Sequence, residues 1–178
     1  MSDRFVIVTS ELRKRYGRVE ALCGLTLQVP VGSIYGFLGR NGAGKTTTIK
    51  VLLGMARATS GTALVFGLPA GGSTVNVEAR RRIGFVSDEK DLYDYMTVGE
   101  MIRFTAAFFP GWRVDLEQRY QRRFDLPVDR SVKALSRGTR TKLALLLALC
   151  RGADLLILDE PTAGLDPAMT EEVLQAVV

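Results

Sequence analysis

The sequence contains no histidine, and it contains little cysteine. The absence of histidine excludes every mechanism that needs an imidazole from this chain. The two cysteines, Cys23 and Cys150, are far apart, and neither belongs to a CxxC pair. This spacing argues against a zinc site or a disulfide framework, and we interpret both residues as ordinary cytosolic thiols.

Long hydrophobic runs and targeting signals are missing as well. The longest nearly unbroken apolar run, 143–150, is too short to span a bilayer and is typical of a buried helix. The N-terminus has no basic start followed by an apolar stretch and a small-residue cleavage site, so we expect no export signal. The 178 residues are 47% apolar, which is enough for one globular domain with a sizeable core.

Positive charge is in modest excess, with a net charge of +5. Such an excess suits nucleic acid, an anionic membrane surface or a nucleotide. The basic residues are spread along the chain in small groups, without a strand pattern of interleaved aromatic residues. We therefore favour solvated faces with some attraction for nucleotide, and we expect no nucleic-acid partner.

The order of apolar segments predicts an α/β fold. We predict strands at 5–8, 25–29, 34–38, 63–66, 83–86 and 155–158, and helices at 46–55, 96–109, 116–124 and across 143–150 after a cap at Ser136. The glycine-rich segment 67–73 predicts a surface loop. The run 155–158 is continuous and apolar, as in a strand that is buried on both faces of a parallel sheet. Strands in this order indicate an α/β domain with a helical insertion near 90–150.

A glycine-rich loop follows the predicted strand 34–38. It has the pattern glycine, four residues, then Gly-Lys-Thr, and it consists of Gly39, Arg40, Asn41, Gly42, Ala43, Gly44, Lys45 and Thr46. The glycines allow the backbone to turn tightly, so that its N–H groups converge on the phosphates of ATP. In this pattern Lys45 reaches the β- and γ-phosphates, the Thr46 hydroxyl ligates Mg²⁺, and the next helix points its positive end at the phosphates. The alternative is a chance glycine loop between a strand and a helix.

Two acidic residues follow the predicted strand 155–158. Asp159 and Glu160 lie at its C-terminal end, where open α/β sheets place ligands. We expect Asp159 to hold Mg²⁺, directly or through water, and Glu160 to polarise the attacking water as the catalytic residue. Two acids after a buried strand are also common at a helix start or in a loop, and the glycine-rich loop favours the metal site.

These segments together resemble the nucleotide-binding domain of the ABC-type ATPases. The resemblance is carried by residues 36–47, 59–62, 135–139 and 159–167, in this order and spacing. It implies one domain over 1–178: a P-loop NTPase core with a mostly parallel sheet and an N-terminal antiparallel β subdomain (1–90 and 151–178), and a helical subdomain at about 91–150. It also implies that Thr47 belongs to the nucleotide site and that Tyr16 stacks on adenine, although a lone tyrosine is usually a packing residue.

In this family two domains meet head to tail around ATP. The resemblance therefore implies that Ser136 and Gly138 contact the nucleotide of a second nucleotide-binding domain. A serine hydroxyl and free N–H groups at a helix N-terminus suit a γ-phosphate. The alternative for Ser136 is a plain helix cap.

Two features depart from the family pattern. The family commonly has a glutamine after the strand 83–86, and this chain has Asp88 there. An ionised carboxylate can still ligate Mg²⁺ but donates no hydrogen bond, so Asp88 is either a metal ligand or a solvated loop acid. The chain also ends before the family's histidine and the last strands of its core. We therefore expect a fragment, a truncated product or a domain that a second polypeptide completes, with slow or absent hydrolysis in isolation.

The resemblance implies the ATPase subunit of an ABC transporter, bound peripherally at the cytoplasmic face of the cell membrane. ATP and Mg²⁺ would be its cofactors, and a second nucleotide-binding domain and a separate membrane permease its partners. An exporter is favoured by analogy. The aromatic residues within 92–109 are either core or the place where the permease docks. The alternatives are a soluble ABC-type ATPase that acts on DNA or ribosomes, and a nucleotide-binding module without turnover.

Overall fold

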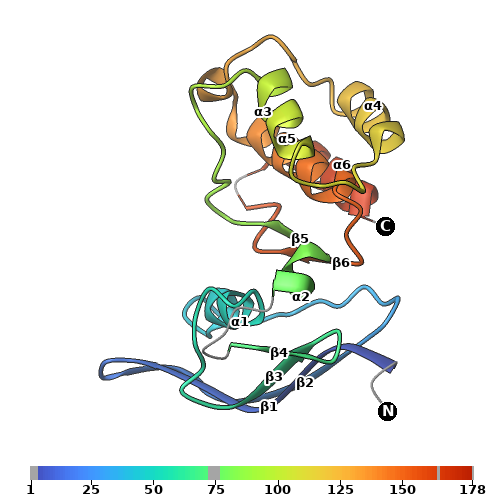
Figure 1. The fold of residues 1–178 in the computed structure, drawn as a ribbon. Helices are drawn as coiled ribbons and strands as arrows, with labels where there is room; N and C mark the ends of the chain where they lie inside the picture. The colour runs from blue at the N-terminus through green and yellow to red at the C-terminus, as the bar shows by residue number, and fades with distance from the viewer. Residues whose placement is uncertain (1–3, 72–76, 164, 178) are drawn as a thin grey trace. The chain divides into compact units, whose positions relative to one another are not determined.

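The computed structural model describes residues 4–71, 77–163 and 165–177, and the side chain of Val177 is not among the described ones. The described residues fall into two compact units, with the division between Arg81 and Arg82. Each unit has its own sheet (Figure 1). No helix among the described residues is both long enough and apolar enough to cross a membrane.

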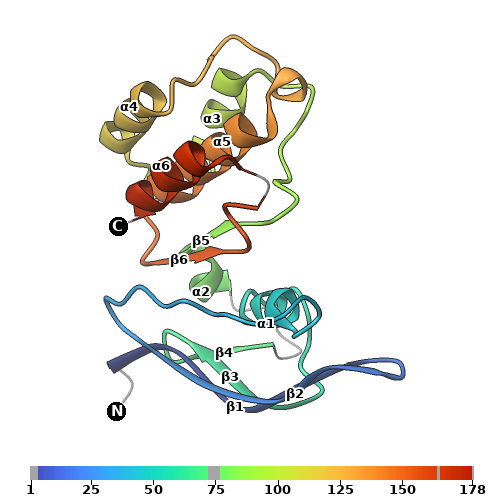
Figure 2. The ribbon, with the colours of Figure 1, turned by 180° about the vertical axis from the view of Figure 1, so that it is seen from behind.

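The first unit is a four-stranded antiparallel sheet that carries a helix on one face. Its elements are β1 (Phe5–Tyr16), β2 (Val19–Pro30), α1 (Lys45–Leu52), β3 (Ser60–Val65), β4 (Leu68–Ala70) and the short α2 (Val77–Arg81). The strand order is β2-β1-β3-β4, and α1 lies over the sheet in both ribbon views (Figures 1 and 2). Leu12, Val51 and Val65 are completely buried between helix and sheet. This confirms the predicted N-terminal antiparallel subdomain.

The second unit contains a parallel strand pair and a group of helices. Its elements are β5 (Ile83–Val86), α3 (Val98–Ala106), α4 (Val114–Arg123), the 3-10 turn η2 (Val132–Ala134), α5 (Arg137–Cys150), β6 (Leu155–Leu158) and α6 (Pro167–Val177). β5 pairs with β6 in parallel, from Ile83 with Leu155 to Val86 with Leu158. The predicted strands 83–86 and 155–158 and the predicted helices in the insertion are therefore confirmed.

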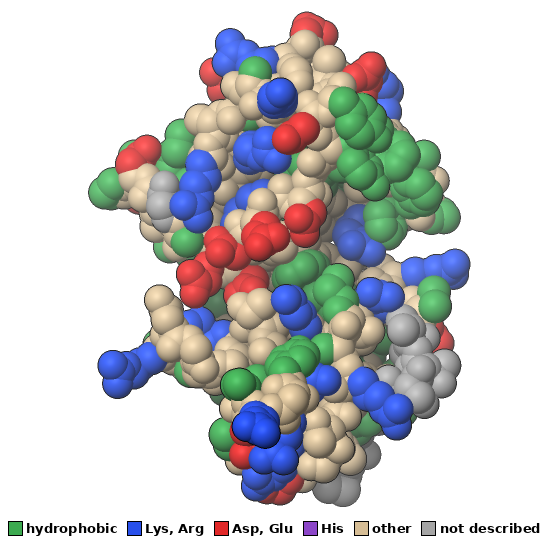
Figure 3. Space-filling view, turned by 90° about the vertical axis from the view of Figure 1, so that its left-hand side faces the viewer, with side chains coloured by type: hydrophobic (Ala, Val, Ile, Leu, Met, Phe, Trp, Pro, Cys, Tyr) green, Lys and Arg blue, Asp and Glu red, His purple; other side chains and the backbone are tan. Residues whose placement is uncertain are grey.

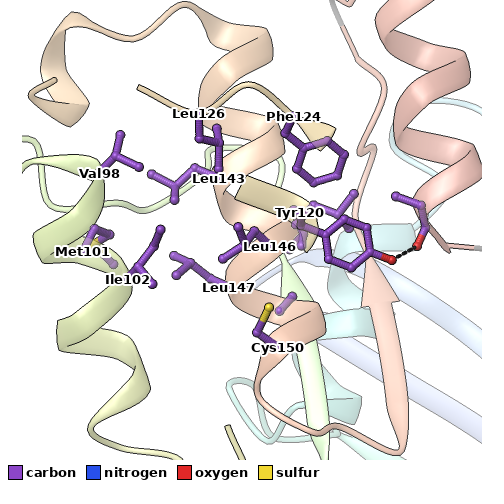
Figure 4. Close-up of a cluster of buried hydrophobic side chains, with 14 of the residues drawn as sticks. Val98, Met101, Ile102, Tyr120, Phe124, Leu126, Leu143, Leu146, Leu147 and Cys150 are labelled. Carbon is purple, nitrogen blue, oxygen red and sulfur yellow. Dashed lines mark hydrogen bonds between the residues drawn. The ribbon is translucent and has the colours of Figure 1, made fainter. Parts of the chain in front are cut away.

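The apolar core of the second unit is built around α5. Leu143, Leu146 and Cys150 of this helix are at most 1% exposed and point into the cluster shown in Figure 4. Tyr120 of α4 packs in the same cluster, and its hydroxyl donates a 3.1 Å hydrogen bond to the carbonyl oxygen of Ala176 in α6. Burial raises the pKa of the Cys150 thiol to about 12, so this cysteine is a neutral packing residue.

Three sequence predictions are wrong, wholly or in part. Residues 34–38 form no strand, and Ile34 and Leu38 are 74% and 92% exposed. A strand persists only with a hydrogen-bonding neighbour, and no described strand pairs with this segment. β6 is only half-buried apart from Ile157, because its described sheet has a single other strand. The predicted loop 67–73 contains β4, whose Leu68 pairs with Val65 of β3, while its residues 72 and 73 lie outside the described residues.

Candidate functional site

The glycine-rich loop is shaped by two residues with left-handed backbone angles. Gly42 has φ 83° and Gly44 has φ 90°, and α1 begins immediately afterwards at Lys45. A Cβ atom on Gly44 would lie 2.5 Å from the carbonyl oxygen of Ala21, so only glycine fits there. Thr48 secures this start, because its hydroxyl donates a 2.9 Å hydrogen bond to the Gly44 carbonyl. The first N–H groups of α1 have no acceptor within the helix and are directed toward the loop.

The Lys45 ammonium folds back over the loop. It donates hydrogen bonds of 2.9 Å to the Gly39 carbonyl and 3.4 Å to the Arg40 carbonyl. The amide of Ala43 closes the same turn through a 3.0 Å bond to the Arg40 carbonyl. A cation, two left-handed glycines and a helix N-terminus therefore surround one small volume, which is the chemistry that a polyphosphate requires.

Three other residues of the first unit, Thr46, Thr47 and Tyr16, are predicted to contact the nucleotide or its metal ion. Thr46 is exposed and Thr47 is half-buried, both in the first turn of α1. Tyr16, at the end of β1, is 48% exposed, and the Lys14 ammonium lies 4.6 Å from its ring centroid. The Tyr16 ring is thus a solvent-accessible aromatic surface. Its stacking on adenine stays a prediction.

The acidic pair lies at the end of β6 in the second unit. The amide of Asp159 donates a 2.9 Å hydrogen bond to the carbonyl of Val86, so that the ends of β5 and β6 stay together. Glu160 is exposed and has φ 47°, a left-handed conformation that is rare outside glycine. Such backbone strain is common at functional sites, where the surrounding structure holds a side chain in one direction.

The environment of Asp159 fits a metal ion. As a residue Asp159 is 4% exposed, and in the described part of the chain no hydrogen bond or ion pair reaches its carboxylate. The Asp159 oxygens are not among the described side-chain atoms that are buried without a hydrogen-bond partner, so they keep access to water or to a cation. Oxygen ligands of this kind suit Mg²⁺. The described residues contain no group of three or more His, Cys, Asp or Glu side chains that would bind a metal by itself.

Asp88 lies in the loop after β5 and contacts the start of α5. Its carboxylate is 3.5 Å from the Arg137 guanidinium, and both side chains are about half exposed. This ion pair gives Asp88 a partner other than a metal, and its role as a Mg²⁺ ligand remains a prediction. The same loop contains Lys90, which is 5% exposed and which sequence analysis missed. Nothing in the sequence distinguishes Lys90 from a solvated lysine among acidic neighbours.

Ser136 and Gly138 both have structural roles in the second unit. Ser136 is the N-cap of α5: its hydroxyl oxygen accepts from the Thr139 amide at 3.2 Å and lies 2.8 Å from the Thr139 hydroxyl. Gly138 is buried under Met169 of α6, and a Cβ atom there would overlap the Met169 sulfur. The structure therefore shows the capping alternative for Ser136. Contact of both residues with a partner's nucleotide stays a prediction.

The chain resembles many known proteins. The family model described as ABC transporter matches residues 22–163. The Nod factor export ATP-binding protein I of Ralstonia nicotianae is 36% identical over 167 residues, which cover 91% of this chain and 51% of that protein. The bacitracin transport ATP-binding protein BcrA of Bacillus licheniformis is 36% identical over 174 residues, which cover 97% of this chain and 56% of that protein. The chain thus spans about half the length of these relatives.

A solved structure has the same fold. The chain cbiO1 from Clostridium perfringens, described as part of the ABC transporter complex cbiONQ, aligns with a TM-score of 0.78 and 26% identity. The alignment covers 98% of this chain and 73% of cbiO1. The family model covers most of the chain, including the phosphate loop and the acidic pair, and the described fold agrees with it. The chain therefore belongs to the ABC transporter family, as an ATP-binding domain with a P-loop fold.

Proposed function

We propose that this chain binds and hydrolyses ATP as the energy-coupling subunit of an ABC transporter. The observation that carries the proposal is the geometry of the phosphate loop. Left-handed Gly42 and Gly44 lead directly into α1, and the Lys45 ammonium bends back to the Gly39 carbonyl. An incoming triphosphate exchanges these intraloop bonds for stronger, charge-assisted bonds to its oxygens.

Asp159 and Glu160 have separate proposed roles, metal binding and proton acceptance. Asp159 of the second unit would be a Mg²⁺ ligand, and Asp88 would be an additional one if it leaves Arg137. Thr46 of the first unit is a further proposed Mg²⁺ ligand. The metal ion, when bound, neutralises the charge that develops on the phosphates. Glu160 is exposed at the end of β6 and accepts a proton from the attacking water. Ser136 and Gly138 would serve the nucleotide of a second nucleotide-binding domain, so that ATP joins two domains.

The name of one relative supports the export direction. The Ralstonia nicotianae protein is named for Nod factor export, and the Bacillus licheniformis protein is named for bacitracin transport. We infer that this chain acts with a separate membrane permease, as an exporter subunit at the cytoplasmic face of the membrane. ATP binding would close a dimer of ATPase domains, and product release would open it, which moves the attached permease.

An aromatic groove in the second unit is the proposed docking site for the permease. The groove has a volume of about 640 Å³ and is lined by Asp91, Leu92, Tyr93, Met101, Phe104, Thr105, Phe108 and Phe109. The ring centroids of Tyr93 and Phe104 are 5.4 Å apart, and those of Phe104 and Phe108 are 5.1 Å apart. Phe108 is 65% exposed. Figure 3 shows hydrophobic side chains gathered in a patch on the surface of this unit. An exposed aromatic patch of this kind usually marks an interface.

A charge in the groove tests the permease proposal. We expect Phe108→Asp to lower the amount of a multi-span membrane protein that co-purifies from detergent-solubilised membranes by at least about tenfold, because it places a carboxylate among apolar contacts. Val114→Asp is the control, since Val114 is 56% exposed on the same unit and lies outside the groove. Equal recovery with both variants would remove the groove from the interface.

Calorimetry tests the nucleotide proposal directly. We expect titration of the chain with Mg²⁺-ATP to give a saturable heat with a dissociation constant in the range of about 1 µM to 1 mM, as for ordinary enzyme substrates. Nuclease-sensitive association with nucleic acid would instead favour the alternative that acts on DNA or ribosomes. No heat with folded protein would contradict the proposed function.

A further inference from the structure

The charges of the chain are divided unequally between its two units. Residues 1–81 contain 11 lysines and arginines but only four acidic residues, which gives the first unit a net charge of +7. Residues 82–178 contain 13 basic and 15 acidic residues, which gives the second unit a net charge of −2. Lys and Arg side chains are prominent on the face of the first unit that Figure 3 shows. The positive excess of the whole chain therefore comes entirely from the antiparallel unit.

The β1–β2 hairpin extends beyond the rest of the antiparallel sheet. β1 pairs with β3 only as far as Arg13, and from there to the turn it pairs with β2, ending with Tyr16 opposite Val19. We call residues 14–19 the hairpin tip. Both ribbon views show the end of this hairpin projecting past β3 and β4 (Figures 1 and 2). Side chains of the hairpin tip are therefore presented to whatever approaches the first unit.

The hairpin tip contains three basic residues: Lys14, Arg15 and Arg18. None of them forms an ion pair within the part of the chain that the structure describes. The two acidic residues of the same hairpin, Glu11 and Glu20, both contact Arg13, at 3.8 Å and 3.1 Å. Because Arg13 takes up these carboxylates, the hairpin tip keeps a positive field that attracts an anionic partner.

An exposed aliphatic side chain lies among these cations. Val19 is 67% exposed and directly follows Arg18, which is also exposed. A phospholipid bilayer suits such a combination, because its headgroups carry negative charge and the layer beneath them accepts apolar groups. A nucleic acid backbone offers the negative charge but no apolar layer for Val19. The chemistry of the hairpin tip thus favours a lipid surface.

We propose that the hairpin tip binds the anionic headgroups of a phospholipid bilayer. The inference rests on the proposed function, which locates the chain at the cytoplasmic face of the membrane, where the leaflet is negatively charged. Lys14, Arg15 and Arg18 contact the headgroups, and Val19 enters the boundary between headgroups and acyl chains. The proposal leaves Tyr16 to its predicted stacking on adenine. Lipid binding of this kind gives the ATPase subunit a second attachment to the membrane besides the permease.

Attraction of nucleotide is the other role that these cations could serve. In that role their loss lowers the affinity for ATP, and the chain has no preference for anionic vesicles. Lipid binding instead requires no nucleotide and depends on the composition of the vesicle. A vesicle titration without nucleotide therefore separates the two roles.

The experiment is co-sedimentation of the full chain with vesicles of phosphatidylcholine that contain about 30% phosphatidylserine, at about 0.1 M salt. We expect the parent chain to bind these vesicles at least about tenfold more tightly than vesicles of phosphatidylcholine alone. The variant Lys14→Gln/Arg15→Gln/Arg18→Gln should bind the anionic vesicles at least about thirtyfold more weakly than the parent. This expectation follows because each basic side chain near the surface contributes about fivefold to the affinity.

A matched variant of the second unit controls for total charge. Arg119→Gln/Arg122→Gln/Arg130→Gln removes the same three charges from exposed side chains and should leave vesicle binding within about twofold of the parent. A separate variant, Val19→Thr, keeps the charge and the branched shape of the side chain. It should weaken vesicle binding about threefold to tenfold, since it removes apolar surface from the bilayer contact.

Circular dichroism shows whether each variant is folded. If the triple hairpin variant does not fold, Arg18→Gln alone tests the proposal, because Arg18 is exposed in the turn between the strands. We expect this single variant to bind anionic vesicles about fivefold more weakly than the parent.

Four results would overturn the assignment of the hairpin tip to lipid. They are an absence of vesicle binding, equal binding to neutral and anionic vesicles, an equal loss in the hairpin and control variants, and unchanged binding by folded Arg18→Gln. Tighter binding to a single-stranded oligonucleotide of about 20 nucleotides than to the vesicles would assign the tip to nucleic acid instead. Failure of the parent to bind Mg²⁺-ATP in calorimetry contradicts the proposed function, because the vesicle titration contains no nucleotide.

Discussion

The Lys45→Ala variant is expected to lose Mg²⁺-ATP binding, with an affinity at least about 100-fold below that of the parent chain. The Lys45 ammonium already lies over the loop, bonded to the Gly39 and Arg40 carbonyls. Alanine removes the ammonium that lies over this loop, and the backbone N–H groups alone cannot balance a triphosphate. Calorimetry or the fluorescence of a labelled ATP analogue measures the loss.

Lys50→Ala is the matched control for this variant. Lys50 is an exposed lysine in the last turn of the same helix, α1, so its removal makes the same change in net charge. We expect its affinity to stay within about threefold of the parent, because an exposed charge is largely screened. Normal ATP affinity in Lys45→Ala, or an equal loss in Lys50→Ala, would contradict the assigned phosphate loop.

The Glu160→Gln variant is expected to bind Mg²⁺-ATP normally and to lose turnover by about 100-fold or more. Glutamine has nearly the shape of glutamate and can adopt the left-handed backbone conformation of Glu160 about as readily as glutamate does. The loop after β6 should therefore keep its conformation. It cannot accept a proton from water, and the nucleotide therefore remains uncleaved. We expect ATP-bound dimers to accumulate, measurable by size-exclusion chromatography with ATP, and phosphate release to be lost from the assembled transporter.

Glu171→Gln is the control for turnover. Glu171 is exposed on α6 in the same unit, and its hydrogen bond from Gln175 can also be made to a glutamine oxygen. Turnover should be unchanged in this variant. If Glu160→Gln also retained the parent's rate of phosphate release, another residue would have to activate the water.

Sequence patterns were sufficient wherever local chemistry decides the structure. The apolar runs 83–86 and 155–158 became β5 and β6 with the predicted bounds, and each of the two strands is the hydrogen-bonding neighbour of the other. The cap at Ser136 and the buried run 143–150 were also correct, since capping and helical periodicity depend on residues within a few positions. The glycine-rich loop was recognisable for the same reason: its function requires particular residues at fixed spacing.

Tertiary contacts decided the rest. The segment 34–38 is as apolar as β5, yet it forms no strand, because strand formation depends on a hydrogen-bonding neighbour that the segment's own sequence does not supply.

The close packing of Met169 on Gly138 also joins residues far apart in the chain. The sequence by itself determined the family, the phosphate loop and the acidic pair. Only the folded structure decided that Lys90 and Asp159 are buried, because long-range packing and desolvation leave no local pattern in the sequence.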